Sequence, residues 1–307
     1  MAKFDAHEAI TATIIEKLEE GTKPWSMPFQ GGSLQFPHRT NGEPYRGINV
    51  LLLWIAAEKR RFTGRTWMTF KQAKALGANV KKGAKSTPII FFKKVQVTDR
   101  KDPEGDKITV PCLRTYNVFN SDQIEGLPER FASPAIVPAQ GMERDREAEE
   151  TLKSCGATIC EGGAGAYYDP AADVVTMPDF ERFKSSSGYL ATLAHELCHW
   201  TGHKSRLDRF GDNDKTSYAF EELVAEIGAA FVGAQLGIVG EHIDNHASYI
   251  ASWLKALRND KKMIFKAAAQ AQLAADMVLE HSAKREAAAP AEAQPEGQEQ
   301  AQFALAV

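Results

Sequence analysis

The sequence predicts an α+β protein of two domains, an N-terminal domain of mixed helices and strands and a mainly helical second domain. The chain has 307 residues, which exceeds the usual size of one domain. Its charge changes sign, with 20 Lys and Arg against 13 Asp and Glu in residues 1–128 and 17 against 27 in residues 129–307. We therefore expect domains at 1–128 and 143–285, a linker at 129–142 and a disordered tail at 286–307.

The first domain begins with a helix that Asp5 can cap and Gly21 can end. Apolar side chains recur along this helix at the spacing of one face, at Ile10, Ile14, Ile15 and Leu18. Two further helices are expected at 47–61 and 70–76. Two strands follow at 88–98 and 107–117, joined by a turn at 102–106 that contains proline and glycine.

Long helical patterns dominate the second domain. A helix is expected at 143–154, followed by two short strands at 166–168 and 174–177 that can pair with each other. Pro178 suits the first turn of a short helix. Three long helices complete the domain at 188–201, 216–236 and 244–283, and the last of them is expected to break near Asn259 and Asp260.

The composition argues against a membrane-spanning or disulfide-stabilised protein. Hydrophobic residues make up 43% of the chain and charged residues 25%, as in ordinary globular proteins. No apolar run approaches the roughly 18 residues of a membrane span, and we find no N-terminal signal peptide. The four cysteines form no CxxC pair, which fits reduced thiols. We expect a cytoplasmic protein that does not engage a membrane.

A metal-binding motif lies in the first long helix of the second domain, at His195-Glu196-Leu197-Cys198-His199. A spacing of four puts both imidazoles on one helix face, so they can share one cation. Glu196 lies beside them, where it can take a proton from water while the metal polarises a carbonyl group. We interpret Cys198 as a buried small hydrophobic residue. The pattern predicts a metal-dependent hydrolase.

A catalytic metal needs a third protein ligand, and the next helix offers candidates. A histidine at position 205 would extend the motif, but the residue is Ser205, and we interpret His203 as a helix-end residue. Glu222 and Glu226 are four apart, so one can bind the metal while the other supports a histidine. The pair resembles the gluzincin arrangement, which implies that Glu222 is the ligand and Glu226 the supporting residue. A shift of register would make Glu226 the ligand.

Two further residues lie next to this pair in the sequence. Glu221 is expected to be solvated, and Tyr218 can donate a hydrogen bond to an oxyanion, with a packing role as the alternative. Two histidines and a carboxylate suit Zn²⁺, and they also accept Mn²⁺ or another divalent metal.

The first domain contains a basic segment rich in aromatic residues. Residues 22–98 hold 14 Lys and Arg, and their only acids are Glu43 and Glu58. Interleaved cations and rings suit single-stranded nucleic acid, because cations follow phosphates while rings stack on unpaired bases. A basic surface over an aromatic core is the alternative interpretation. The candidate DNA-binding residues are Trp25, Tyr45, Arg46, Arg60, Arg61, Arg65, Trp67, Lys71, Lys81, Lys82, Lys85, Lys93 and Lys94.

Several stretches together resemble ArdC-type antirestriction proteins, which conjugative plasmids carry. The resemblance covers about residues 4 to 285. In the first half it rests on residues 24–29, Tyr45-Arg46-Gly47-Ile48-Asn49, residues 67–73, residues 80–83 and Tyr116-Asn117-Val118-Phe119-Asn120. In the second half it rests on residues 195–203 and 218–231.

The resemblance implies a single-stranded-DNA-binding domain joined to a zincin-like metallopeptidase domain. It also implies that the protein shields incoming plasmid DNA from restriction enzymes. Our first hypothesis is that the metal site cleaves a protein held nearby, a restriction-enzyme subunit or another protein. Two other functions stay open: a non-catalytic coat for single-stranded DNA with a structural or regulatory metal domain, and a DNA-templated protease for DNA-bound proteins. Glu196 favours chemistry, because a structural zinc needs no general base.

Overall fold

The computed structural model describes residues 5–25, 36–97, 108–131, 143–210, 215–238 and 247–288. The first half contains α1 (Ala6–Glu19), α2 (Ile48–Arg60), β1 (Trp67–Met68), α3 (Phe70–Ala75), β2 (Asn79–Val80), β3 (Thr87–Val97), β4 (Ile108–Asn120) and β5 (Ile124–Glu125), with short 3-10 helices at Ser121–Gln123 and Glu129–Phe131. The second half contains α4 (Arg146–Lys153), β6 (Thr158–Glu161), β7 (Tyr167–Asp169), β8 (Val174–Met177), a 3-10 helix at Phe180–Arg182, α5 (Ser186–Trp200), α6 (Lys215–Leu236), α7 (Ala247–Asn259) and α8 (Met263–Ala288).

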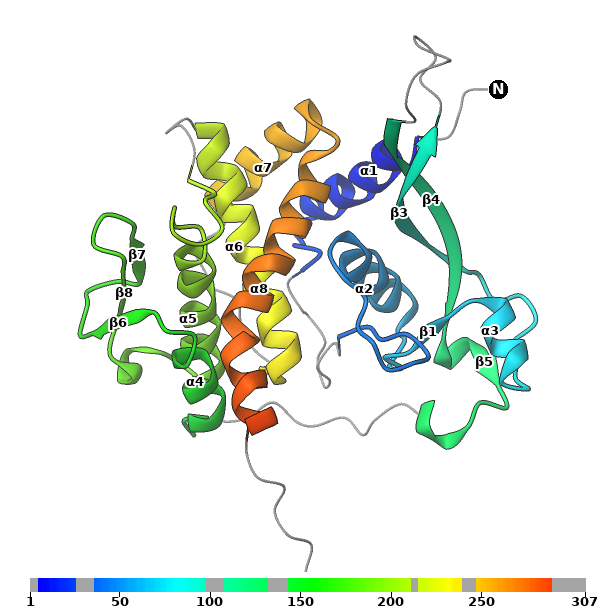
Figure 1. Cartoon of the computed structure of the whole chain (residues 1–307), viewed down its shortest axis with the longest axis horizontal. Coiled ribbons are helices and arrows are strands. Elements are labelled where there is room, and N and C mark those ends of the chain that lie inside the picture. Colours follow the sequence, from blue (N-terminus) through cyan, green and yellow to red (C-terminus); the bar gives the residue numbers. More distant parts are fainter. Residues whose placement is uncertain are drawn as a thin grey trace, which may run out of the picture.

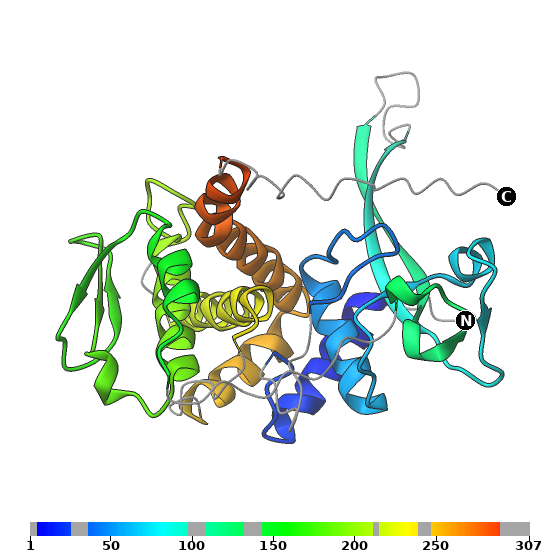
Figure 2. The same ribbon diagram turned by 90° about the horizontal axis from the view of Figure 1, so that it is seen from below.

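These elements are arranged in layers along the long axis of the molecule (Figures 1 and 2). The small sheet β6–β8–β7 lies at one end, and the helices α4, α5, α6 and α8 lie next to it. Helices α1 and α2 follow, and the sheet β1–β4–β3, whose long strands β3 and β4 form a ribbon, stands at the opposite end. The expected α+β class is confirmed.

Local signals in the sequence explain where the helices begin. The Asp5 carboxylate accepts hydrogen bonds from the backbone N–H groups of His7 and Glu8, which caps α1 as expected. Ser185 caps α5 in the same way by accepting from the Gly188 N–H at 3.0 Å. The expected break in the last long helix is also confirmed, because α7 ends at Asn259 and α8 begins at Met263.

The strands agree with the sequence in part. The expected pair in the first domain is the antiparallel ribbon β3–β4, whose register runs from Thr87 opposite Val118 to Val97 opposite Ile108. Its expected turn at 102–106 lies outside the described residues. In the second domain β7 and β8 pair as expected, but β6 was missed. Strand β6 is short and mostly exposed, so it lacks the apolar alternation that marks a strand.

The two halves of the chain share one hydrophobic core. The ring of Trp25 packs edge-on against Trp253 at 5.6 Å, and Phe36 packs against Phe231 at 5.8 Å. The Thr11 hydroxyl also donates to the Lys261 carbonyl oxygen at 2.8 Å. The domain boundaries therefore remain a prediction, and most of the expected linker and tail, at 132–142 and 289–307, lie outside the described residues.

Within the described ranges, none of the helices has the length and apolar character needed to cross a bilayer. The thiols of Cys155, Cys160 and Cys198 are free.

Helix α6 packs against both α5 and α8, and Gly228 lies where it crosses α5. A Cβ atom added at Gly228 would lie 2.7 Å from the Cys198 sulfur and 3.5 Å from the Ala271 carbonyl oxygen. The first distance is too short for any non-bonded contact, so the close approach of these helices requires glycine. Cys198 is fully buried at this contact, as expected.

We expect Gly228→Ala to lower the free energy of unfolding by about 1–3 kcal/mol, because the added methyl group overpacks the α5–α6 contact. The matched control is Gly233→Ala in the same helix, where the nearest atom to an added Cβ is 3.7 Å away. There alanine should be neutral or should stabilise by up to about 1 kcal/mol, since alanine favours helix. Urea unfolding of both variants checks this, and equal stabilities would contradict the packing argument. Cys198→Ala should restore part of the loss in Gly228→Ala.

Candidate metal centre

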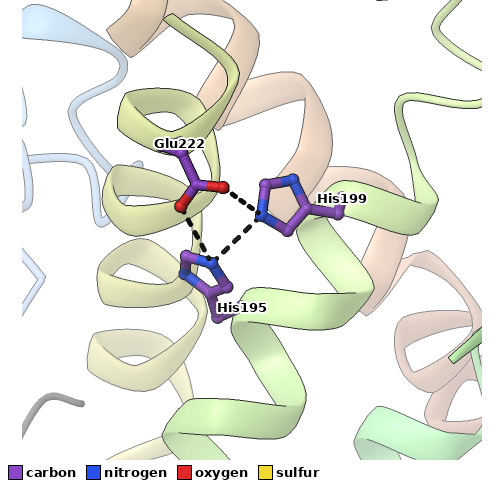
Figure 3. A group of neighbouring side chains, drawn as sticks. All are labelled: His195, His199 and Glu222. Carbon is purple, nitrogen blue, oxygen red and sulfur yellow. Dashed lines mark hydrogen bonds and ion pairs between the residues drawn. The ribbon is translucent and has the colours of Figure 1, made fainter. Parts of the chain in front are cut away.

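Three side chains from two helices converge on one point (Figure 3). His195 and His199 project from α5, and Glu222 reaches them from α6. The two histidine Nε2 atoms are 3.1 Å apart. One Glu222 carboxylate oxygen lies 3.8 Å from His195 Nε2, and the other lies 3.6 Å from His199 Nε2. All three ligand atoms lie within 4.8 Å of one another.

This spacing fits a single divalent cation. Metal–ligand bonds of about 2.0–2.1 Å in a tetrahedral site separate neighbouring ligand atoms by about 3.3 Å. The three observed separations lie close to that value, and two imidazoles with one carboxylate are a common donor set. His195 and Glu222 are 6% and 7% exposed, so these polar groups need a partner. His203 lies outside the group, with its Nδ1 atom 2.8 Å from the Ser205 hydroxyl.

Glu196 adjoins this group and is itself only 7% exposed. Burial raises the pKa of its carboxyl group to about 6, and the nearby Glu222 carboxylate adds to the effect. His199 and the backbone N–H of Tyr168 in β7 act in the opposite direction. A carboxylate with a pKa near neutrality is a stronger base than an exposed glutamate, which suits proton transfer from water.

Glu221 corrects one expectation, because it is 8% exposed and not solvated. Its carboxylate lies 3.2 Å from His199 Nδ1 and accepts two hydrogen bonds from the Arg209 guanidinium, at 2.9 and 2.7 Å. Burial opposes ionisation of Glu221, but Arg209 and His199 outweigh it and lower the pKa. Glu221 thus orients the imidazole of His199 and leaves Nε2 directed at Glu222.

Sequence reasoning missed Arg209, which is 3% exposed at its side chain. Its guanidinium also donates to the Thr201 hydroxyl at 2.8 Å and to the Cys198 carbonyl oxygen at 2.7 Å. These bonds attach the segment that follows α5 to the end of that helix. No local pattern marks Arg209, because its partners are separated from it along the sequence.

Glu226 lies one turn after Glu222 and is 3% exposed. Its carboxylate accepts hydrogen bonds from Lys23 Nζ and from the Trp25 indole N–H, both at 3.3 Å. Burial lowers the pKa of Lys23 although the Glu226 carboxylate opposes this. Both partners come from the first half of the chain. The expectation that Glu226 also supports a histidine stays a prediction.

Tyr218 lies on α6, one turn before Glu222, and its side chain is exposed. Its hydroxyl shares a 3.0 Å hydrogen bond with the hydroxyl of Tyr249. Burial of the hydroxyl, the Tyr249 hydrogen bond and the Glu222 carboxylate all raise the pKa of Tyr218. The phenol therefore stays protonated and is able to donate a hydrogen bond.

The structure corrects the expectation for three of the candidate DNA-binding rings. Trp25, Tyr45 and Trp67 are 0%, 5% and 2% exposed. The Trp25 indole is bonded to Glu226, and the Tyr45 hydroxyl donates to the Trp67 carbonyl oxygen at 3.3 Å. These rings belong to the core and leave no face for a base. Hydrophobic periodicity could not distinguish buried from exposed aromatic residues here, because these segments have little regular secondary structure.

Most of the candidate cations lie at the surface. The exposed ones are Arg46, Arg61, Arg65, Lys71, Lys81, Lys82 and Lys85. Some have structural partners: Arg46 pairs with Asp276, Lys81 donates to the Asp122 carbonyl oxygen, and Arg60 donates to the Lys85 carbonyl oxygen at 2.7 Å. Lys93 and Lys94 lie on β3, and their side chains are outside the described part.

Comparison with protein families finds two matches along the chain. Residues 4–119 match the family described as the N-terminal domain of anti-restriction factor ArdC. Residues 146–270 match the family described as zincin-like metallopeptidase.

Two solved structures resemble most of the chain. The metal-free crystal structure of the antirestriction protein ArdC from plasmid R388 has 44% sequence identity and a TM-score of 0.82, and the match covers 92% of this chain and 99% of that one. The Mn(II)-bound structure of the same protein has 43% identity and a TM-score of 0.78, with 91% and 99% covered. The expected two-domain fold with a zincin-like domain is confirmed.

Curated relatives extend the comparison. Two Escherichia coli proteins named DNA primase TraC are 39% and 40% identical over 91% of this chain, which spans only 20% and 27% of their lengths. An uncharacterized protein of Sinorhizobium fredii, y4eC, is 36% identical over 89% of this chain and 91% of its own length.

We expect Glu221→Gln to weaken binding of Mn²⁺ or Zn²⁺ by about 10- to 100-fold, because the imidazole of His199 loses its charged partner. His199→Ala should lose the metal altogether, since it removes a ligand. The matched control is Glu181→Gln, which changes an exposed glutamate. Calorimetric titration of the chelator-treated protein gives the affinities. Unchanged affinity in Glu221→Gln would contradict the orienting role.

Replacing Glu196 with glutamine should stabilise the metal-free protein at neutral pH. The pKa of this carboxyl group rises from 4.5 to about 6 on folding, so the unfolded chain ionises first and the wild type loses stability as pH rises between these values. The variant should exceed the wild type in free energy of unfolding by about 2 kcal/mol above the folded-state pKa, and the two should be equal below the unfolded-state pKa. Urea unfolding with chelator on both sides of this window measures it. The exposed Glu150→Gln is the control, and no gain at neutral pH in Glu196→Gln would refute the cost of burial.

Proposed function

The chain belongs to the ArdC antirestriction family, and we propose that it binds single-stranded DNA and protects incoming plasmid DNA by means of a metal-dependent peptidase site. The observation that carries the peptidase part is the convergence of His195, His199 and Glu222 beside the buried Glu196. A purely structural metal site has four protein ligands and no need of a neighbouring base.

The residues fit Zn²⁺ or Mn²⁺. The zincin-like domain implies a divalent metal, and the related plasmid protein has been solved with Mn(II). In our proposal His195, His199 and Glu222 hold the cation, and Glu221 and Arg209 keep the imidazole of His199 oriented. A cation bound there supplies a Lewis acid that polarises a carbonyl group and makes water more acidic.

The chain's own residues carry the proton transfers. Glu196 removes a proton from the water whose oxygen attacks the peptide carbonyl carbon. When the carbon–nitrogen bond breaks, the same carboxyl group returns that proton to the departing amine. The Tyr218 hydroxyl, which stays protonated, donates a hydrogen bond to the carbonyl oxygen as negative charge develops on it.

The first half supplies the proposed contact with DNA. The match to the ArdC N-terminal domain and the excess of cations in residues 22–98 support binding of single strands. The proposed place of action is the cytoplasm, where restriction enzymes meet entering DNA. A protein held close to that DNA, such as a restriction-enzyme subunit, is the proposed substrate.

We expect Glu196→Gln to abolish protection of incoming plasmid DNA while leaving metal content and single-strand binding unchanged. Glutamine keeps the shape of the side chain but cannot accept the proton. Transfer of an unmodified plasmid into restricting cells that express either form measures protection, with Glu150→Gln as the matched control.

Two other results would support the alternative functions. If Glu196→Gln protects as well as the wild type, the DNA-binding half provides protection by coating the strand, and the metal domain serves a structural or regulatory role. Cleavage of DNA-bound proteins in general, and not only of restriction enzymes, would favour a DNA-templated protease.

A further inference from the structure

The β3–β4 ribbon has two different faces. Helix α2 packs along one face, where Ile90 is 3% exposed and the Asn49 side chain bonds to both the N–H and the carbonyl oxygen of Ile90, at 2.9 and 2.8 Å. Successive residues of a strand point to opposite faces, so Phe91 lies on the other side. Figure 1 shows α1 and α2 on the inner side of the ribbon, at one end of the molecule.

Two aromatic rings occupy this outer face. Phe91 is 51% exposed and Tyr116 is 45% exposed. Their ring centroids are 6.3 Å apart, and the rings are nearly perpendicular at 81°. The register explains the contact, because Phe91 lies opposite Arg114 and Ile89 lies opposite Tyr116 two residues away on the same face, which makes Phe91 and Tyr116 diagonal neighbours. Neighbouring exposed rings form an apolar patch, and such patches often mark a binding site.

A cation lies beside the rings. Arg114 is exposed and directly opposite Phe91, so the two side chains share the outer face. The exposed Lys82 and Lys85 lie in the segment that leads into β3. Neither β3 nor β4 contains an Asp or Glu residue. The surface therefore combines flat apolar rings with positive charge.

That combination matches the chemistry of single-stranded DNA. Unpaired bases offer flat faces for stacking, and the phosphates offer negative charge for guanidinium and ammonium groups. In duplex DNA the bases are already stacked on one another, so duplex leaves the rings without partners. Sheet surfaces with exposed aromatic residues are a common way to stack two or three bases.

We propose that the outer face of the β3–β4 ribbon is the base-stacking platform of this protein, with Phe91 and Tyr116 stacking on unpaired bases and Arg114 contacting a phosphate. The assignment rests on the proposed function of the first half as a single-strand binder. It gives the stacking role to rings that are exposed, in place of Trp25, Tyr45 and Trp67, which are buried.

The test is a fluorescence-anisotropy titration of labelled oligothymidine with the full-length chain at several salt concentrations. Phe91→Ala and Tyr116→Ala should each weaken binding about tenfold or more, because each removes one stacked base. Their salt dependence should equal that of the wild type. Arg114→Gln should instead reduce the slope of log affinity against log salt by about one. Tyr116→Trp should retain affinity, which separates loss of stacking from loss of folding.

The matched control is Tyr167→Ala, which removes a ring that is 53% exposed on β7 at the other end of the molecule, and its affinity should not change. Wild-type binding with unchanged affinity in folded Phe91→Ala and Tyr116→Ala would overturn the platform alone. No binding by the wild type would overturn the platform and the proposed DNA binding together. Loss of self-association in sedimentation, with DNA affinity unchanged, would assign the face to a second copy of the chain instead.

Discussion

The close contact between α5 and α6 is the constraint on which the metal centre depends. Cys198 lies between the two motif histidines, and its sulfur occupies the space that a side chain at Gly228 would need. Glu222 is six residues before Gly228 on α6, about 9 Å along the axis. Because the helices touch at Gly228, the carboxylate of Glu222 comes within 3.6 and 3.8 Å of the two imidazoles. A side chain at this crossing would push Glu222 away from His195 and His199.

Bringing carboxylates into this contact has an electrostatic cost that the surrounding cations partly offset. Glu221 is neutralised by Arg209, and Glu226 is paired with Lys23, each within a largely buried environment. Glu196 has less compensation, and burial raises the pKa of its carboxyl group. Negative charge next to two imidazoles favours positive charge at this centre, which a divalent cation supplies. The charge pattern around the site therefore supports the metal that the ligand geometry fits.

Local patterning in the sequence predicted the helices and their ends, which depend on neighbouring residues. It located α1, α2, α5 and α6 and the break between α7 and α8, and the four-residue spacing of His195 and His199 put both on one face. It could not predict contacts between distant residues, such as Arg209 with Glu221 or Lys23 with Glu226, because nothing local records them. The same limit explains why Trp25 and Trp67 were candidates for DNA binding, with an aromatic core as the alternative. The exposure of Phe91 could have been predicted, because alternation along β3 directs it to the face opposite that of the buried Ile90.

Helix α6 connects the candidate metal centre to the first half of the chain. Within two turns it carries Glu222, which faces the histidines, and Glu226, which holds Lys23 and Trp25. The Lys23–Glu226 pair is 11% and 3% exposed at its side chains, and leaving one member of such a pair without its partner costs about 3–5 kcal/mol. The segment that contains Lys23 and Trp25 therefore cannot leave α6 without a large loss of stability. The same segment packs on Trp253 of α7, so α6 is in contact with the first half of the chain as well as with α5 and α7.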